Sequence, residues 1–225
     1  MQVSRYSGLN GARDLRGSVV ILDVIRASNT VLGALDSGAR EVWLVEELDE
    51  ARSLKAANPQ WELWGERGGV MVPGFAGDNS PALARSRDLT GVSVVLTTTN
   101  GTRAAGLLNN ADPVFIGSLA NAAALCEFIL QLNPSWVTLL AAGHGDNSPA
   151  LEDELVADHL ESLLKGHESD PKRVAKAILA CGAAKTLRQL GQQDDLKWCA
   201  SPDISNMIAV VDAGETPRAR PWNIR

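Results

Sequence analysis

The sequence predicts an α/β protein built as a single three-layer α/β/α domain with a mostly parallel or mixed sheet. Short apolar runs alternate with helical patterns through most of the 225 residues, and this alternation is typical of a sheet covered by helices. The hydrophobic content of 45% supports a sizeable core, which aliphatic residues must fill because only 4% of the chain is aromatic. No linker is long or biased enough to divide the chain. We therefore expect one domain over residues 1–225, with a core at about 17–212 and an exposed tail at 213–225.

The strands are predicted from the apolar runs. Residues 18–25 form a run that only Asp23 interrupts, which is typical of a strand buried on both faces. The further predicted strands are residues 41–46, 62–67, 92–96, 113–117, 136–142 and 208–211. The last ten residues instead carry two prolines and three arginines, which favours the exposed tail at 213–225.

The helices are predicted from apolar periodicity and from their start signals. Ser80-Pro81 supplies an N-cap and a proline at the first helical position. The run Gly-Asp-Asn-Ser-Pro-Ala-Leu occurs at residues 77–83 and again at 145–151. These copies are either two efficient helix starts or two helix N-termini that line one anion pocket. The other predicted helices end near Ser37, cover 47–57, 101–109 and 119–132, open at Ser148-Pro149, and cover 171–190.

The charge and the cysteines narrow the class of protein. A net charge of −6 argues against nucleic acid or an anionic membrane as the main partner. The cysteines Cys126, Cys181 and Cys199 are odd in number and widely spaced, which fits reduced, structural thiols. The chain lacks a run of 18 apolar residues and a signal-peptide pattern. We expect a cytoplasmic protein, and the sequence leaves both a monomer and a homo-oligomer open.

Polar residues gather just after the predicted strands. The carboxyl ends of parallel strands share one edge of a sheet, where ligands bind. A hard divalent cation prefers carboxylate oxygens, and phosphate prefers arginine forks and backbone N–H groups. Together these residues predict a metal-assisted site for a phosphorylated anion. The residues are Asp23, Arg26, Ser28, Asn29, Thr30, Glu66, Arg67, Ser118, Asn121, His144, Asp146, Glu152 and Asp153, with Asn79 and Ser80 added if the repeated run binds an anion.

The stretch Val94–Arg103 is the strongest candidate for an anion-binding loop. A buried strand leads into hydroxyl side chains, an Asn-Gly pair and an arginine. Free N–H groups at the start of the following helix and the threonine hydroxyls suit a phosphate. The predicted substrate-binding residues in it are Thr97, Thr98, Thr99, Asn100, Gly101, Thr102 and Arg103.

Each candidate also has a structural interpretation. Asp23 could cap the next loop, and Arg26 could form a structural ion pair. Glu152 and Asp153 in the first turn of a helix could compensate the helix dipole. His144, which lies between two glycines, could be a general acid or an ordinary loop residue. The residues alone leave these alternatives open.

Spacing excludes several familiar phosphatase chemistries. Asp23-Val-Ile25 lacks the second aspartate of a phosphoaspartate enzyme. The sequence contains no Cys-x5-Arg loop and no Arg-His-Gly. It also contains no phosphate-binding Gly-x4-Gly-Lys-Ser/Thr loop and no Gly-x-Ser-x-Gly elbow.

The ordered motifs resemble the 2-phosphosulfolactate phosphatase family. The similarity runs from about residue 17 to Trp198-Cys199 and covers most of the chain. Two departures are Ser28-Asn29, where the family more often has threonine, and Ala150-Leu151, where a serine usually precedes the acidic pair. The motifs are Asp23–Thr30, Gly65–Gly69, Gly74-Phe75, Gly77–Pro81, Thr97–Arg103, Gly117-Ser118, Asn121-Ala122 and Leu151–Asp153.

The resemblance implies an Mg²⁺-dependent phosphatase that converts 2-phospho-3-sulfolactate to 3-sulfolactate and phosphate, a step of coenzyme M biosynthesis. We expect Asp23 and Glu66, with Glu152 or Asp153, to hold Mg²⁺. Arg26 and Arg67 would complete the catalytic set, and a polarised water would attack in line. Two alternatives stay open, namely a lyase or isomerase of a phosphorylated hydroxy acid and a non-catalytic protein that binds small anions.

Overall fold

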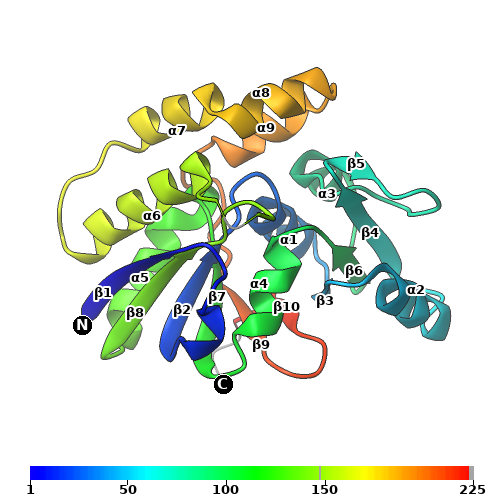
Figure 1. The fold of residues 1–225 in the computed structure, drawn as a ribbon, viewed down its shortest axis with the longest axis horizontal. Helices are drawn as coiled ribbons and strands as arrows, with labels where there is room; N and C mark the ends of the chain where they lie inside the picture. The colour runs from blue at the N-terminus through cyan, green and yellow to red at the C-terminus, as the bar shows by residue number, and fades with distance from the viewer. Residues whose placement is uncertain (147, 223–225) are drawn as a thin grey trace.

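The structure is a computed structural model that describes residues 1–146 and 148–222. In this part of the chain the strands form one mixed sheet with helices on both faces, which confirms the predicted α/β fold (Figure 1). The order of the strands across the sheet is β1-β8-β2-β7-β9-β10-β3-β6-β4-β5. Their bounds are β1 Gln2–Ser7, β2 Gly17–Leu22, β3 Glu41–Val45, β4 Glu62–Arg67, β5 Val70–Met71, β6 Ser93–Thr97, β7 Ala111–Gly117, β8 Trp136–Ala141, β9 Ala209–Asp212 and β10 Arg218–Pro221.

The sheet consists of two parallel blocks joined by antiparallel strands. Strands β1, β8, β2 and β7 are parallel, as are β3, β6 and β4. Strands β9 and β10 pair antiparallel between the blocks, so the second block runs against the first along the ladder. A twist of about 20–25° per strand accumulates to roughly 100–125° over the five steps from β2 to β6. This rotation turns the carboxyl ends of the two blocks toward each other.

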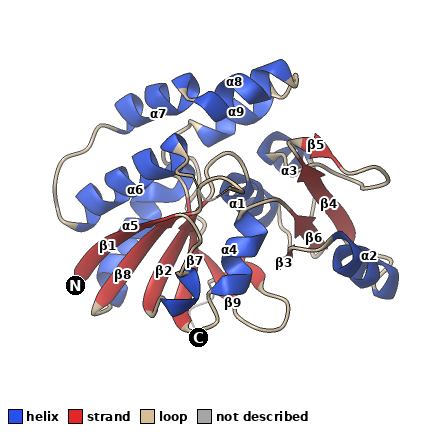
Figure 2. Cartoon of the chain, viewed as in Figure 1, coloured by secondary structure: helices blue, strands red, loops and turns tan. Residues whose placement is uncertain are grey.

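Helices cover both faces of the sheet (Figure 2), and alternating side chains on β2 belong to two separate core layers. Val19 and Ile21 pack with α1 (Ala27–Asp36), α3 (Pro81–Ser86) and α4 (Gly101–Leu107). Val20 and Leu22 pack with α5 (Ala122–Leu132) and α6 (Leu151–Leu164). Helix α2 (Leu48–Ala57) covers a smaller cluster on β3, β4 and β6. The period of two in an extended strand thus produces the predicted three layers.

Three short helices form a further layer above the carboxyl ends of the strands (Figure 1). They are α7 (Pro171–Ala180), α8 (Gly182–Gln189) and α9 (Gln193–Cys199). The prediction of one helix over 171–190 is wrong, because Cys181 is extended and its sulfur accepts the N–H of Ala184 as the N-cap of α8. Of the helices in the described ranges, none is long and apolar enough to cross a membrane.

Both ends of the chain contribute strands that the sequence did not predict. Strand β1 pairs with β8 at the sheet edge, although its polar residues gave no apolar run. The expected exposed tail is also corrected over β10, which lies inside the sheet between β9 and β3, while residues 223–225 of that prediction lie outside the described residues. Ala219 is fully buried there, and the neighbouring Arg220 pairs with Asp212 at 2.6 Å. Strand β10 was not predicted because its arginines alternate with small residues, a pattern that also occurs in exposed loops.

The two copies of the repeated run adopt different structures. Ser80 caps α3 by accepting the N–H of Leu83 at 3.1 Å, with Pro81 at the first position, which confirms the prediction. Helix α6 instead begins at Leu151. The hydroxyl of Ser148 donates to Asp146 at 2.6 Å, so this serine closes a local turn. The prediction that a helix opens at Ser148-Pro149 is wrong by two residues.

Candidate functional site

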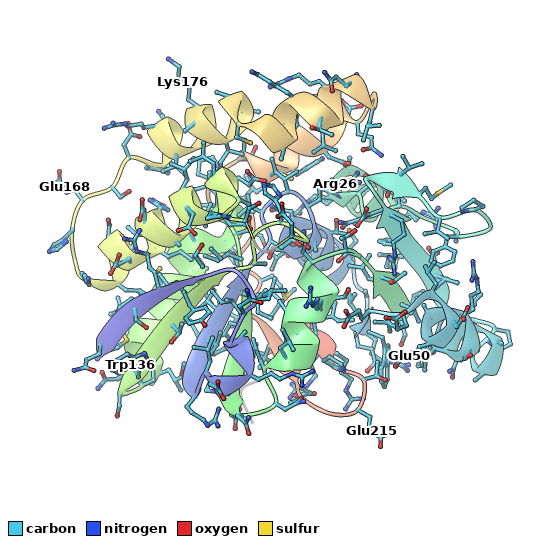
Figure 3. The ribbon with its side chains drawn as sticks, viewed as in Figure 1. Arg26, Glu50, Trp136, Glu168, Lys176 and Glu215 are labelled. Carbon is cyan, nitrogen blue, oxygen red and sulfur yellow. The ribbon has the colours of Figure 1, made fainter. Side chains whose placement is uncertain are left out.

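A pocket of about 500 Å³ opens where the loops after β2, β4, β6 and β8 meet helix α8. Arg26 lies inside the molecule near this junction, beneath the layer of α8 and α9 (Figure 3). The pocket is therefore at the strand ends, as the sequence predicts for a ligand site. Its lining residues are Asp23, Ile25, Arg26, Glu66, Gly68, Gly69, Asn79, Thr98, Thr99, Asn100, His144, Gly182, Ala183, Thr186, Leu187 and Leu190.

Asp23 follows β2 and is 8% exposed. Burial raises the pKa of its carboxyl to about 6, against the N–H of Ala27, which lowers it. The charges of Glu66 and Glu152 contribute to this rise in the pKa of Asp23, so acids from β4 and α6 lie near enough to act on it. Gly101 lets the start of α4 lie against Asp23, because a Cβ at this position would lie 2.9 Å from Oδ2 of Asp23.

Glu66 joins the turn after β4 to the loop after β6. Its Oε1 accepts the N–H and the hydroxyl of Thr99 at 3.0 and 3.1 Å, and its Oε2 accepts the N–H of Gly69 at 2.7 Å. These bonds fix both loops at the pocket wall. Glu66 consequently has a structural task beside any role toward a ligand.

The two acids at the start of α6 have different surroundings. Asp153 accepts the N–H groups of Val24 at 2.8 Å and Gly143 at 3.1 Å, and so ties the end of β2 to the end of β8. Burial raises the pKa of Asp153 well above its usual range, with the nearby Asp23 charge adding to the effect. Glu152 is 3% exposed, and its charge acts on Asp23. Neither acid is among the residues that line the pocket. Because both oxygens of Asp153 already accept backbone N–H groups, Glu152 is the better candidate ligand of the two.

Arg26 is the arginine that the described structure brings into the pocket wall. Its Nη1 donates to Asp195 at 2.7 Å and to Asp78 at 3.2 Å, and its Nη2 donates to the carbonyl of Gly69 at 3.3 Å. The predicted structural ion pair of Arg26 is therefore present. Lining a pocket and forming an ion pair are compatible, because a guanidinium carries five N–H donors.

Arg67 and Arg103, in contrast, lie away from the pocket. Arg67 donates to the carbonyls of Glu46 and of Glu66, both at 2.7 Å, and to the hydroxyl of Thr97 at 2.9 Å. Arg103 is partly exposed and faces Glu46, with 3.8 Å between Nε and Oε1. The expected three-arginine pocket is therefore reduced to Arg26.

The loop after β6 divides into pocket residues and supporting residues. Thr98, Thr99 and Asn100 line the pocket. Thr102 and Thr98 cap each other, since the Thr102 hydroxyl donates to the Thr98 carbonyl at 2.9 Å. The Thr97 hydroxyl donates to the Glu46 carbonyl at 3.2 Å. The loop is thus present as predicted, but only its middle faces the ligand space.

Several predicted substrate-binding residues support the fold instead. Ser118 and Asn121 form a capping box and are fully buried. The Ser28 hydroxyl accepts the N–H of Asp23 at 3.0 Å, and the Thr30 hydroxyl donates to the Arg26 carbonyl at 3.3 Å. The Ser80 hydroxyl binds Asp195. They hold the loops that carry the pocket residues.

Two asparagine oxygens are buried at the pocket without a hydrogen-bond partner in the described structure. They are Oδ1 of Asn79 and Oδ1 of Asn100, and both residues line the pocket. An unpaired buried acceptor is costly, so these oxygens mark where a ligand or a water is needed. Asn79 and Asn100 are predicted site residues that the structure places in the pocket.

Sequence reasoning missed the wall made by α8. One face of this helix lines the pocket with Ala183, Thr186 and Leu187, at the spacing of three and four residues. Leu190, which caps the end of the helix, continues this wall. The signal available was Gly182, but the single long helix predicted over 171–190 concealed it. His144, which the sequence left undecided, lies at the exposed edge of the pocket.

The acidic cluster fits a hard divalent cation. Among the described residues, no three His, Cys, Asp or Glu side chains form a ready-made metal cage. In the same ranges Asp23, Glu66 and Glu152 form no ion pair with a basic side chain. Mg²⁺ needs only one or two carboxylates when waters and a substrate phosphate complete its shell. The donor set suits Mg²⁺ in that partial manner.

Comparison with known proteins identifies the family. Residues 6–214 match the family model described as 2-phosphosulpholactate phosphatase. The chain is 32% identical to the probable 2-phosphosulfolactate phosphatase of Caldicellulosiruptor saccharolyticus, over 84% of this chain and 86% of that protein. It is 33% identical to the protein of the same name from Symbiobacterium thermophilum, over 91% and 95%. These names are those of a phosphatase, that is, a phosphoric monoester hydrolase. The resemblance seen in the motifs is confirmed, and the chain belongs to the 2-phosphosulpholactate phosphatase family.

Proposed function

We propose that this protein hydrolyses 2-phospho-3-sulfolactate, or a related small phosphorylated 2-hydroxy acid, with Mg²⁺ bound beside Asp23. The names of the relatives supply the substrate class. The observation that carries the metal is the cluster of Asp23, Glu66 and Glu152, whose charges act on one another without a basic partner in the described chain.

Charge balance supports a cation in this pocket. 2-Phospho-3-sulfolactate carries about four negative charges, since its phosphate monoester contributes roughly −1.5 to −2 and its carboxylate and sulfonate contribute about −1 each. The pocket wall carries Asp23 and Glu66 against Arg26, and Arg26 is already paired with Asp195. A polyanion would be repelled from such a wall. A divalent cation beside the acids reverses the sign of the local field.

The protein groups have distinct tasks under this proposal. Asp23, with Glu66 or Glu152, would hold Mg²⁺, which when bound neutralises phosphoryl oxygens and lowers the pKa of a water. Arg26 binds and orients the phosphate at the wall that Thr98, Thr99 and Asn100 help to form. His144 at the pocket edge donates a proton to the leaving alkoxide. The apolar residues Ala183 and Leu187 of α8 keep water away from the side of the pocket that this helix covers.

Phosphate release tests the proposal. Purified protein is incubated with 2-phospho-3-sulfolactate and with a panel of phosphorylated 2-hydroxy acids, with Mg²⁺ or with EDTA. We expect release from 2-phospho-3-sulfolactate or a close analogue, and loss of release with EDTA that Mg²⁺ restores. Substrate consumption without phosphate release would indicate a lyase or isomerase. Binding of the panel without turnover would indicate a non-catalytic protein.

A further inference from the structure

Asp195 on α9 lies far from the pocket motifs in the sequence but is bonded to two of them. The residue is 3% exposed. Its Oδ2 accepts Nη1 of Arg26 at 2.7 Å, and its Oδ1 accepts the N–H of Ala82 at 3.1 Å and the hydroxyl of Ser80. One buried carboxylate therefore joins the loop after β2 to the start of α3.

This carboxylate fixes the guanidinium of Arg26. Asp195, Asp78 and the carbonyl of Gly69 hold its two terminal nitrogens, and within the described chain its Nε has no hydrogen-bond partner. Because the guanidinium is planar, holding the terminal nitrogens also fixes the direction of Nε–H. Asp195 thus sets the orientation in which Arg26 meets the pocket.

The same carboxylate also places Asn79. Asn79 precedes Ser80, is 5% exposed, and carries an unpartnered Oδ1 at the pocket wall. Bonds from Asp195 to Ser80 and Ala82 hold the backbone on the carboxyl side of Asn79. Gln192 strengthens the junction by donating to Asp78 at 2.8 Å and to Gly69 at 3.0 Å.

We propose that Asp195 is a positioning residue of this pocket, which orients the guanidinium of Arg26 toward the phosphate group of the ligand and holds Asn79, with its unpartnered acceptor oxygen, at the pocket wall. The identity of that group rests on the proposed function. A residue that served only to anchor α9 would not require a buried carboxylate bonded to a pocket arginine. The apolar contact of Leu196 with the cluster around Cys181 already packs the helix.

The test compares Asp195→Asn with Asp194→Asn. Asp194 is the adjacent residue, is exposed and pairs with Lys197, so it is a matched control. An asparagine at 195 cannot accept on both sides, because its NH₂ must face either Arg26 or the donors of α3. We expect KM to rise roughly 10- to 100-fold, as loss of a hydrogen bond to a charged group predicts, with a smaller change in kcat. The dissociation constant of inorganic phosphate with Mg²⁺ should rise by a similar factor, and the control should match the wild type.

The phosphate measurement separates this inference from the proposed function. If the wild type binds phosphate but releases none from any substrate, the proposed function fails, while weaker phosphate binding by folded Asp195→Asn still supports the positioning role. Phosphate affinity and KM within about twofold of wild type in folded Asp195→Asn would overturn it. If that variant does not fold, Asp195→Glu decides by the same binding measurement: weaker binding than in Asp194→Asn supports the role, and equal binding overturns it.

Discussion

The loops after β4 and β6 have an inner side that faces the pocket and an outer side that faces away from it. Glu66 lines the pocket and is 6% exposed, whereas the next residue, Arg67, bonds the carbonyl of Glu46. After β6, Asn100 at the start of α4 lines the pocket, whereas Arg103 in the first turn of that helix faces the Glu46 carboxylate. Polar residues only one to three positions apart therefore perform opposite tasks, one toward a ligand and one toward the protein surface.

This difference shows why position after a strand does not by itself assign a residue to a site. Successive side chains of an extended strand point to opposite faces, so a motif such as Glu66-Arg67 is divided by geometry. The outer arginine satisfies carbonyl groups at the end of the sheet, which need partners. The inner side keeps the acids, and this excess of negative charge is the reason that a cation is needed for an anionic substrate.

The largest expected effect belongs to the inner side, at Asp23. Asp23→Asn keeps the shape but removes the charge that would hold Mg²⁺. Loss of several kcal/mol of charge stabilisation corresponds to a fall in kcat/KM of roughly 10³-fold, measured by phosphate release at saturating Mg²⁺. Retention of more than a tenth of the activity would place the metal elsewhere.

Glu66→Gln is expected to cost less, because Glu66 both faces the pocket and holds two loops. A glutamine can accept from Thr99 or from Gly69 but presents its NH₂ to the other N–H. We expect kcat/KM to fall roughly 10- to 100-fold, in line with losing a hydrogen bond to a charged group. An unchanged rate would show that the loops hold their places without this carboxylate.

Asp153→Asn tests whether this acid supports the stability of the fold or takes part in the chemistry of the pocket. Its carboxyl accepts two backbone N–H groups, and the NH₂ of an asparagine must face one of them. Leaving that buried N–H unsatisfied should lower the unfolding free energy by about 1–3 kcal/mol, or Tm by roughly 2–12 °C. Thermal denaturation and kcat at a temperature well below Tm provide the check. A loss of activity as large as that of Asp23→Asn, with unchanged Tm, would make Asp153 a metal ligand after all.

The smallest effects are expected on the outer side. Arg103→Ala and Arg67→Ala should change kcat/KM by less than about threefold, because neither guanidinium lines the pocket. Arg103 forms a partly exposed ion pair, which contributes roughly 0–1 kcal/mol, and Arg67 bonds carbonyl groups on the outer side. Kinetics of both variants with the same substrate provide the measurement. A tenfold rise in KM for either variant would show that the arginine contacts the anionic substrate and would contradict this assignment.

Much of the fold follows from local pattern. The apolar runs that became β2, β3, β6, β7 and β8 are buried on both faces and therefore stand out in the sequence. Strands β1 and β10 were missed because polar and charged residues alternate in them, and a half-buried strand of that kind resembles a loop. The reversal between the two parallel blocks depends on β9 and β10, so no local pattern could reveal it.

The candidate site was predictable in part. Asp23, Glu66, Asn79 and the middle of the threonine loop were found because they follow strands or start a helix. Arg67 and Arg103 were assigned incorrectly to the pocket, since their directions depend on strand phase and on Glu46. Asp195 and the wall of α8 were beyond reach, because only the tertiary packing brings the C-terminal helices over the strand ends.

Divalent-cation binding tests the central claim most directly, namely that the inner acids hold a metal and the outer arginines do not contribute. Mn²⁺ can substitute for Mg²⁺ as a probe, and electron paramagnetic resonance measures its free concentration in titrations of wild type, Asp23→Asn and Arg103→Ala. We predict saturable binding by the wild type and by Arg103→Ala with similar affinity, and at least tenfold weaker binding by Asp23→Asn. Equal affinity for all three proteins, or no saturable binding by the wild type in the presence of phosphate, would contradict the account.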